Sequence, residues 1–173
     1  ITNQLGISED IIKLEPTVIG GMYPSHMEDR VLLNWPEVPP ILVDTILAVE
    51  DQDFFNHYGI SLKSISRAFL RNVQAGEVEQ GGSTITQQLA KSLFFSSEQT
   101  IRRKVLEAIA SLIIEFRYSK EEILLAYIND VFLAQSGKRA IHGFGMGAQH
   151  FFGTSIQNLS TDQVALLVGM LKG

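Results

Sequence analysis

The sequence predicts a mainly α-helical fold with a short β-containing N-terminal segment. Apolar residues recur at helical spacing after Pro40, and Ser/Thr-x-x-Glu/Gln capping boxes, which mark helix starts, recur further along the chain. The first 40 residues show no such pattern. The chain has 173 residues, of which 45% are hydrophobic and 19% charged, and this suits one globular domain with its own core.

Residues 1–40 carry short β-like pieces at 17–19 and 30–33, separated by Gly20, Gly21, Pro24 and the pair Pro39 and Pro40. Glycine permits turns and proline has no N–H to donate, so these residues interrupt regular structure. We therefore expect residues 1–40 to be a linker, or the remnant of a preceding accessory domain with short strands. Residues 41–173 are expected to form the main domain.

The helix starts of the main domain have recognisable signals. Pro40 suits the first position of a helix, where its missing N–H costs nothing, and apolar spacing continues from Ile41 to Val49. A further helix is predicted over 61–73, with Gly76 as its stop. Capping boxes predict four more starts, at Thr84 with Gln87, Ser96 with Gln99, Ser119 with Glu122, and Ser160 with Gln163.

Composition excludes several kinds of function. The net charge of −5 argues against nucleic acid as a partner, so an anionic ligand requires a local basic patch. The absence of cysteine excludes disulfides and thiolate chemistry. The longest uncharged apolar stretches, 108–114 and 164–171, are shorter than the roughly 20 residues that span a bilayer. Because no signal peptide or initiator methionine is present, we expect a fragment, with any membrane anchor outside it.

Three acidic residues, Glu50, Asp51 and Asp53, follow one another closely at the end of the first predicted helix. A helix C-terminus carries partial negative charge, so acids there are disfavoured unless something else requires them. Two interpretations stay open. The cluster is either a solvated acidic turn or the position of a carboxylate that transfers a proton. His57 nearby is more often a hydrogen-bonded structural histidine than a catalyst.

A second polar cluster lies in residues 80–91, where glycines and Ser83 precede a predicted helix. Thr84, Gln87, Gln88 and Lys91 lie along one side of that helix. The glycines permit close backbone approach, and the helix N-terminus offers N–H groups to an anion. This pattern predicts a phosphate or sugar site, although an ordinary capped amphipathic helix explains it equally well. The Gly-Lys-Ser/Thr ending of a nucleotide P-loop is missing.

A third cluster places Arg103 and Lys104 four and three residues before Glu107 on a predicted helix. The two cations and the carboxylate therefore share one face, and a surface ion-pair ladder is the usual explanation. Residues 108–116 are nearly all apolar, so we expect this helix to be largely buried and its basic first turn to line a cleft.

Together these clusters resemble the conserved blocks of glycosyltransferase family 51, the peptidoglycan polymerases. The resemblance extends from about residue 42 to 173, and its details are similar to the bifunctional class A penicillin-binding proteins of the 1b type. The matching positions are Glu50, Asp51, Phe54, His57 and Gly59; residues 81–88; Arg103, Lys104 and Glu107; Lys120, Ile123, Leu124, Tyr127 and Asn129; and residues 143–144 and 151–153. The chain departs from the pattern at Ser92, Leu125 and His142.

The resemblance implies a lysozyme-like helical glycosyltransferase domain over 41–173, with its C-terminal end truncated. It implies polymerisation of lipid II into β-1,4-linked glycan by inverting transfer, with release of polyprenyl pyrophosphate. Glu50 would be the catalytic base, and Glu107 would either orient the neighbouring cations or hold a divalent ion. The implied substrate-binding residues are Ser83, Thr84, Gln87, Gln88, Lys91, Arg103, Lys104 and Lys172, supported by Asp51, Phe54, His57 and Gly59 of the first block.

The resemblance also implies the partners and location. No cofactor is expected to be required, and Mg²⁺ or Mn²⁺ near the pyrophosphate is left open. Expected ligands are lipid II, the lipid-linked glycan chain and the inhibitor moenomycin. A lipoprotein activator and cell-division or elongation proteins would act through domains outside this chain. The domain would lie at the outer, periplasmic face of the bacterial cytoplasmic membrane, with residues 65–70 as candidates for membrane contact.

Two other classes of function stay open. A lysozyme-like muramidase or lytic transglycosylase would also suit a helical domain with a glutamate at a helix end. A hydrolase of uncharged glycosidic links has little use for the cations Lys91, Arg103 and Lys104, whereas a pyrophosphate leaving group requires them. In a non-catalytic binding domain the charged clusters would be surface charge only, and changing Glu50 would have no effect.

Overall fold

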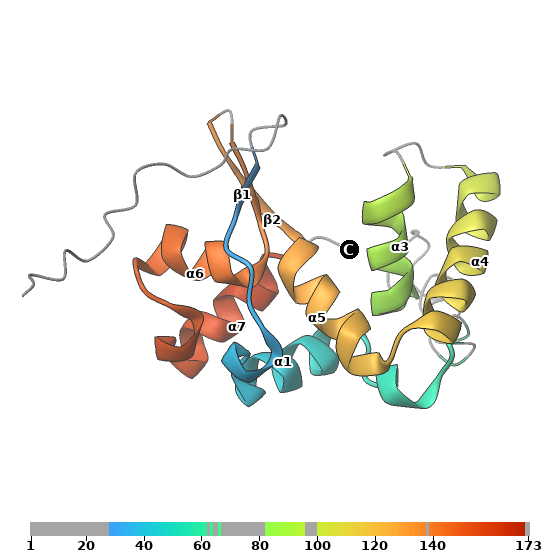
Figure 1. Cartoon of the computed structure of the whole chain (residues 1–173), viewed down its shortest axis with the longest axis horizontal. Helices are drawn as coiled ribbons and strands as arrows, with labels where there is room; N and C mark the ends of the chain where they lie inside the picture. Colours follow the sequence, from blue (N-terminus) through green and yellow to red (C-terminus); the bar gives the residue numbers. More distant parts are fainter. Residues whose placement is uncertain are drawn as a thin grey trace, which may run out of the picture.

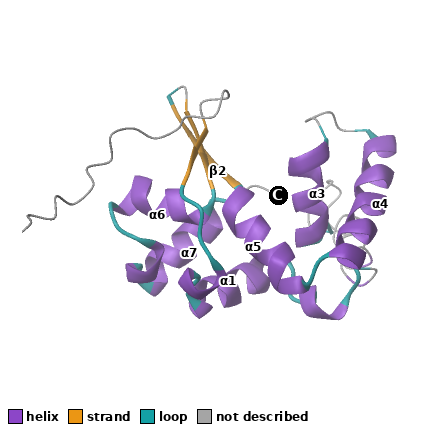
Figure 2. Ribbon diagram, in the orientation of Figure 1, coloured by secondary structure: helices purple, strands orange, loops and turns teal. Residues whose placement is uncertain are grey.

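The computed structural model describes residues 28–61, 63, 66, 82–95, 100–137 and 139–171. Helices make up most of this structure, and a small sheet lies at one end (Figure 2). Helix α6 contacts the sheet and α7 packs against α6 and α1, while α3 and α4 form a separate pair and α5 lies between the two groups (Figure 1). The mainly α, lysozyme-like fold class expected from the sequence is confirmed.

The bounds of the helices and strands are as follows. The α-helices are α1 (Pro40–Glu50), α3 (Ile85–Phe94), α4 (Ile101–Arg117), α5 (Lys120–Asp130), α6 (Phe144–Phe152) and α7 (Thr161–Gly169). Short 3₁₀ turns cover Trp35–Glu37, Phe54–Asn56 and Ile156–Asn158. The strands are β1 (Glu28–Arg30), β2 (Phe132–Ser136) and β3 (Arg139–His142).

The predicted capping boxes explain where three helices begin. Both hydrogen bonds of the box are present at Thr84 for α3, at Ser119 for α5 and at Ser160 for α7. Helix α4 begins later than its sequence signal, because Thr100 is its N-cap and accepts a hydrogen bond from the Arg103 N–H at 3.1 Å. The box at 96–99 and nearly all of the predicted helix over 61–73 lie outside the described residues.

The sheet has the strand order β1–β3–β2, with β1 parallel and β2 antiparallel to β3. The strand expected at 30–33 is placed earlier, at Glu28–Arg30, and the piece at 17–19 lies outside the described residues. The hairpin of β2 and β3 was not predicted. Its short strands, of 5 and 4 residues, follow a strongly helical segment and offer little alternation.

Part of the segment expected to be a linker packs on the domain. The Asn129 side chain accepts a hydrogen bond from the Leu33 N–H at 2.8 Å and donates one to the Leu33 carbonyl at 2.9 Å. Arg30 forms an ion pair with Asp130 at 2.8 Å. Residues 28–39 therefore belong to the same folded unit as the helices, which argues for a domain that starts before residue 41.

Apolar side chains of α1, α3, α5, α6 and α7 form one core. The largest fully buried side chains include Phe54, Tyr127, Phe144 and Leu42. Burial of each such side chain contributes about 1.5–3 kcal/mol to folding. Helix α5 contacts both α3 and α6, so it joins the two groups of helices and fixes how they lie relative to each other.

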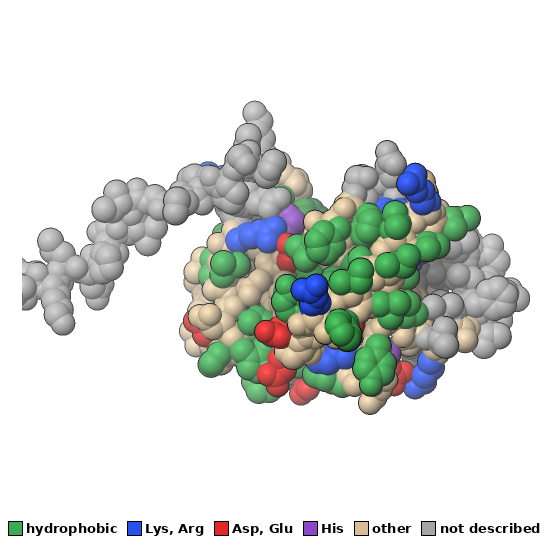
Figure 3. Space-filling model, turned by 45° about the vertical axis from the view of Figure 1, so that its right-hand side comes forward, with side chains coloured by type: hydrophobic (Ala, Val, Ile, Leu, Met, Phe, Trp, Pro, Cys, Tyr) green, Lys and Arg blue, Asp and Glu red, His purple; other side chains and the backbone are tan. Residues whose placement is uncertain are grey.

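Helix α4 is much more exposed than its apolar sequence predicts. Its buried residues are Glu107, Ser111 and Ile114, while its apolar side outside this seam faces solvent. The exposed apolar residues, called here the α4 apolar face, are Ile101, Val105, Leu106, Ile109, Leu112, Ile113 and Phe116. Hydrophobic side chains gather on this part of the molecule (Figure 3). The expectation of a largely buried helix is therefore wrong, because a charged cluster occupies its inner side.

None of the helices that the structure describes combines the length and the apolar character needed to span a bilayer.

Candidate active site

Glu50 is the last residue of α1, and its carboxylate is held by α3. The Gln88 side-chain amide donates a hydrogen bond to Glu50 Oε2, with a distance of 2.7 Å from Nε2 to Oε2. The Gln88 amide oxygen in turn accepts a hydrogen bond from the Tyr127 hydroxyl at 3.2 Å. Glu50 itself is half-buried.

Asp51, the next residue, is buried and has a structural role. Its Oδ2 atom accepts a hydrogen bond from the Ile85 N–H at 3.1 Å and contacts His57 Nε2 at 2.9 Å. The Ile85 N–H is one of the unpaired donors at the start of α3, where a carboxylate is favourable. Asp51 thus fastens the end of α1 to the beginning of α3 and fixes the place where Glu50 meets Gln88.

The His57 tautomer follows from its two partners. The Gly59 N–H donates to His57 Nδ1 at 3.1 Å, so the ring proton is on Nε2, which donates to Asp51. Gly59 has φ +81°, and a Cβ atom there would lie 2.9 Å from the Ser111 carbonyl oxygen of α4. Only glycine fits this position without displacement. His57 and Gly59 therefore support the site rather than take part in chemistry.

Phe54 is the remaining first-block residue with a large side chain. It is fully buried, and the Lys120 ammonium lies 4.3 Å from the centroid of its ring. Lys120 also forms an ion pair with Glu115 at 2.7 Å, and Glu115 accepts a hydrogen bond from Thr86 at 2.6 Å. This network connects the turn after α1 to α3, α4 and α5.

The predicted substrate-binding residues at the start of α3 divide into two groups. Thr84 and Gln87 are buried and satisfy each other in the capping box, and the Thr84 hydroxyl also donates to the Gly59 carbonyl at 2.7 Å. The Thr84 hydroxyl and the Gln87 amide oxygen therefore have protein partners. Ser83 and Gln88 are only partly buried and contact the charged residues Lys104 and Glu50. These two are the more accessible side chains of the segment 83–88.

Glu107 is a buried carboxylate between two cations. Its side chain is 1% exposed, with Oε1 2.7 Å from Arg103 Nε and Oε2 3.2 Å from Lys104 Nζ. The ammonium of Lys104 also donates to the Ser83 hydroxyl at 2.7 Å. The three charged residues do share one helix face, but the face is turned inward, so a surface ladder does not describe it. Removing either kind of partner would leave a buried charge uncompensated.

The same contacts indicate how well Glu107 could hold a divalent ion, a role that the sequence left open. Both Glu107 oxygens already face cations, and a metal ion there would be repelled by Arg103 and Lys104. Within the described ranges, no group of three or more His, Asp or Glu residues is arranged to hold a metal. Glu107 is therefore a poor fit for Mg²⁺ or Mn²⁺, and its pairing with the two cations matches the orienting role.

Lys91 and Lys172 are two further predicted cations of the site. Lys91 lies in the last turn of α3, three residues beyond Gln88, and its side chain is exposed. No carboxylate in the described part of the chain forms an ion pair with it. Lys172 lies outside the described residues, as does the candidate membrane segment 65–70.

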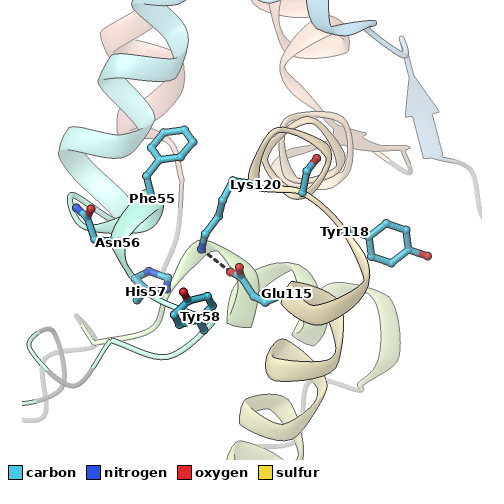
Figure 4. Close-up of a pocket in the computed structure, with 8 residues that line it drawn as sticks. Phe55, Asn56, His57, Tyr58, Glu115, Tyr118 and Lys120 are labelled. Carbon is cyan, nitrogen blue, oxygen red and sulfur yellow. Dashed lines mark hydrogen bonds and ion pairs between the residues drawn. The ribbon is translucent and has the colours of Figure 1, made fainter.

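A surface pocket of about 300 Å³ lies apart from Glu50 and Glu107. The turn at 55–58 and the junction of α4 and α5 line it, and the Lys120–Glu115 ion pair crosses it, while the Tyr118 ring points away (Figure 4). His57 is the one predicted site residue among those that line it. The pocket therefore lies beside the turn that follows α1 and contains neither of the two predicted catalytic glutamates.

The segment 83–88 joins the two glutamates. Ser83 contacts the cluster around Glu107, and Gln88 contacts Glu50. These two positions are separated by roughly 10 Å, given the rise per residue of helical and extended chain. The structure thus brings a half-buried carboxylate and an organised cationic cluster to the two ends of one short segment. Tyr127, to which the sequence assigned no role, is the additional residue in contact with this arrangement.

The helical fold, the half-buried Glu50 and the cations around Glu107 agree with the family to which the sequence assigns the chain. The chain belongs to the transglycosylase family, whose sequence pattern matches residues 16–173, and it is a peptidoglycan glycosyltransferase domain. The match begins before residue 41, as the packing of β1 also indicates.

Among curated proteins the chain is similar to penicillin-binding protein 1B from two bacteria. It is 50% identical to that of Vibrio cholerae over 162 residues, 94% of this chain and 21% of the relative. It is 48% identical to that of Escherichia coli over 161 residues, 93% of this chain and 19% of the relative. Penicillin-binding protein 1A of Aquifex aeolicus is 37% identical over 146 residues. The chain thus spans about a fifth of the length of these relatives.

Proposed function

We propose that this domain polymerises lipid II into β-1,4-linked glycan strands by inverting transfer. The observation that carries the proposal is the segment 83–88, which contacts both Glu50 and Lys104, one of the two cations paired with Glu107. A transfer reaction of this kind needs a base for the attacking hydroxyl and positive charge for the departing pyrophosphate. The two clusters supply one of these each.

In the proposed step, Glu50 accepts the proton of the lipid II 4-hydroxyl as its oxygen bonds to the donor's anomeric carbon. The bond from that carbon to the pyrophosphate oxygen breaks, and the electron pair leaves with the polyprenyl pyrophosphate. Attack opposite the leaving group inverts the anomeric centre, so an α-linked donor gives a β link. The Gln88 amide donates to the carboxylate and so holds it in place.

The leaving group is proposed to contact Lys104, Arg103 and the exposed Lys91. Glu107 neutralises part of this charge and fixes the positions of the first two cations, which supports orientation rather than metal binding. Lys104 is half-exposed, so its ammonium can reach a ligand while it keeps its ion pair. Lys172 is proposed as a further cation of the same set.

The membrane surface is proposed as the site of action, because both substrates carry lipid tails. The α4 apolar face supports this, since seven large apolar side chains on one helix are exposed beside the proposed pyrophosphate-binding cations. We also propose a periplasmic location, a membrane anchor in another part of the protein, and contacts with a lipoprotein activator and with cell-division or elongation proteins. These partners would act through other domains.

The decisive assay is incubation of the purified protein with labelled lipid II in detergent, followed by separation of glycan products. Polymer should form with the wild-type protein and be lost in Glu50→Gln. Glu121→Gln, an exposed glutamate in the first turn of α5, is the matched control and should polymerise normally. Cleavage of preformed glycan without polymer formation would instead indicate a muramidase or lytic transglycosylase. Full activity in Glu50→Gln would contradict both enzyme classes.

Binding of moenomycin tests the pyrophosphate assignment separately. The inhibitor resembles the lipid-linked donor, so Lys91→Ala and Arg103→Ala should each weaken it. A contact between a charged side chain and a phosphate contributes about 1.5–3 kcal/mol, which corresponds to roughly a 10- to 150-fold loss in affinity. Unchanged affinity in both variants would remove these cations from the site.

A further inference from the structure

Three helices contribute to one chain of side-chain hydrogen bonds that ends on the proposed base. Tyr127 of α5 donates to Gln88 of α3, and Gln88 donates to Glu50 of α1, with distances of 3.2 and 2.7 Å. Tyr127 is 1% exposed and lies among the core side chains. Water therefore does not reach most of its ring, and the hydroxyl has a defined partner.

The order of donors and acceptors in this chain is fixed by chemistry. An ionised carboxylate only accepts hydrogen bonds, so the Gln88 NH₂ group must face Glu50. The amide oxygen of Gln88 then points to α5, where it accepts a hydrogen bond from a donor on that helix. The Tyr127 hydroxyl is that donor. A flipped amide would place its oxygen against the carboxylate and repel it.

We propose that Tyr127 is a positioning residue for the transfer reaction: by donating to Gln88 it fixes the amide orientation that holds the Glu50 carboxylate in place for proton transfer. Tyr127 does not touch the substrate in this proposal and acts only through Gln88. The inference rests on the proposed function in one respect, namely that Glu50 is the base.

The protonation of Tyr127 agrees with this role. Burial, and secondly the nearby Glu50 carboxylate, raises the pKa of the Tyr127 phenol well above its ordinary value. The hydroxyl therefore keeps its proton throughout the pH range in which a glutamate base acts. The donor at the far end of the chain is constant, and only Glu50 changes its protonation during the reaction.

The first experiment compares polymerisation kinetics of Tyr127→Phe with wild type. The variant keeps the ring and its packing but loses the hydroxyl. We expect kcat to fall roughly three- to tenfold, the value of one neutral hydrogen bond, with KM unchanged, because proton transfer and not substrate binding is affected. Tyr118→Phe, on an exposed tyrosine outside the chain of hydrogen bonds, should match wild type.

A double-mutant cycle separates positioning from general loss of packing. If Tyr127 acts through Gln88, Tyr127→Phe in a Gln88→Ala background should cause no further fall in kcat. Additive effects, or a Tyr127→Phe variant with wild-type kcat, would overturn the proposal. Thermal unfolding of each variant checks that the fold is retained.

A measurement without substrate distinguishes this proposal from the proposed function. The Gln88 side-chain NH₂ resonances, assigned by their loss in Gln88→Ala, should shift in Tyr127→Phe and again in Glu50→Gln. If wild-type protein forms no polymer but these shifts occur, the proposed function fails while the chain of hydrogen bonds stands. If the resonances are indifferent to Tyr127→Phe, the positioning role fails whatever the activity.

Discussion

Replacing Gly59 with alanine tests the contact that fastens the first block to α4. The backbone of Gly59 has φ +81°, which costs an L-residue about 1–2 kcal/mol. The new Cβ atom would lie 2.9 Å from the Ser111 carbonyl oxygen and 3.1 Å from Glu115 Cγ. Relief of that clash must displace the Gly59 backbone, which donates to His57 at 3.1 Å and accepts from Thr84 at 2.7 Å.

The expected loss of stability follows from these contributions. Weakening two hydrogen bonds adds about 0.5–1.5 kcal/mol each, so the free energy of unfolding should fall by about 2–5 kcal/mol in total. A domain of this size loses roughly 2–4 °C of melting temperature per kcal/mol, which predicts a fall of roughly 4–20 °C. Thermal unfolding followed by circular dichroism at 222 nm measures it.

The matched control is Gly153→Ala. Gly153 has a comparable φ of +64°, but an added Cβ would meet no atom within 4 Å. That variant should therefore lose only the backbone contribution, about 1–2 kcal/mol. Equal losses at the two positions would refute the reasoning, because they would show that the contact with α4 contributes nothing beyond the backbone conformation.

Three other predictions concern charge and protonation. Glu107→Gln leaves Arg103 and Lys104 without a counter-charge, so it should lower the free energy of unfolding by about 3–5 kcal/mol and abolish polymer formation. The control Glu121→Gln should do neither. A stable and active Glu107→Gln variant would contradict the role of this charged cluster. Because the folded-state pKa of Tyr127 is raised, its contribution to stability is complete below pH 10 and is lost as the pH rises above it, by up to about 1.4 kcal/mol per pH unit. Urea unfolding between pH 9 and 11 should show this slope in wild type and a shallower one in Tyr127→Phe. Excess EDTA should leave polymerisation unchanged, and a loss that Mg²⁺ or Mn²⁺ restores would contradict the orienting role of Glu107.

The helices could be predicted because their signals are local. Apolar spacing and the boxes at Thr84, Ser119 and Ser160 depend on residues within one or two turns of each other, and all three caps are present. The strands β2 and β3 could not be predicted, since short strands are stabilised by pairing with distant chain.

The orientation of α4 shows where composition misleads. An apolar run normally indicates burial, but Glu107 and its two cations form a compact, mutually neutralising group that packs against α3. Which side of α4 faces inward thus depends on the hydrogen bond from Lys104 to Ser83 and on the close approach of Gly59, not on the apolar residues of the helix itself.

The sequence predicted the residues that lie around the segment 83–88 but not the contacts of each, and their roles in binding and catalysis stay predictions. The capping box in the sequence already pairs Thr84 with Gln87, but nothing local shows that Ser83 and Gln88 face charged groups. Tyr127 carried a signal in its position within the fourth block. Its partner is 39 residues away, so only the fold reveals it.

The pairing of β1 with β3 has a consequence for synthesis of the chain. Arg30 and Asp130, joined by the ion pair beside this sheet, are separated by 100 residues. At roughly 5–20 residues per second, a ribosome takes of the order of 5–20 s to extend the chain from one to the other. During that interval the strand's N–H and C=O groups have no partner from β3, so the N-terminal segment depends on solvent, or on a chaperone, until the last third of the domain emerges.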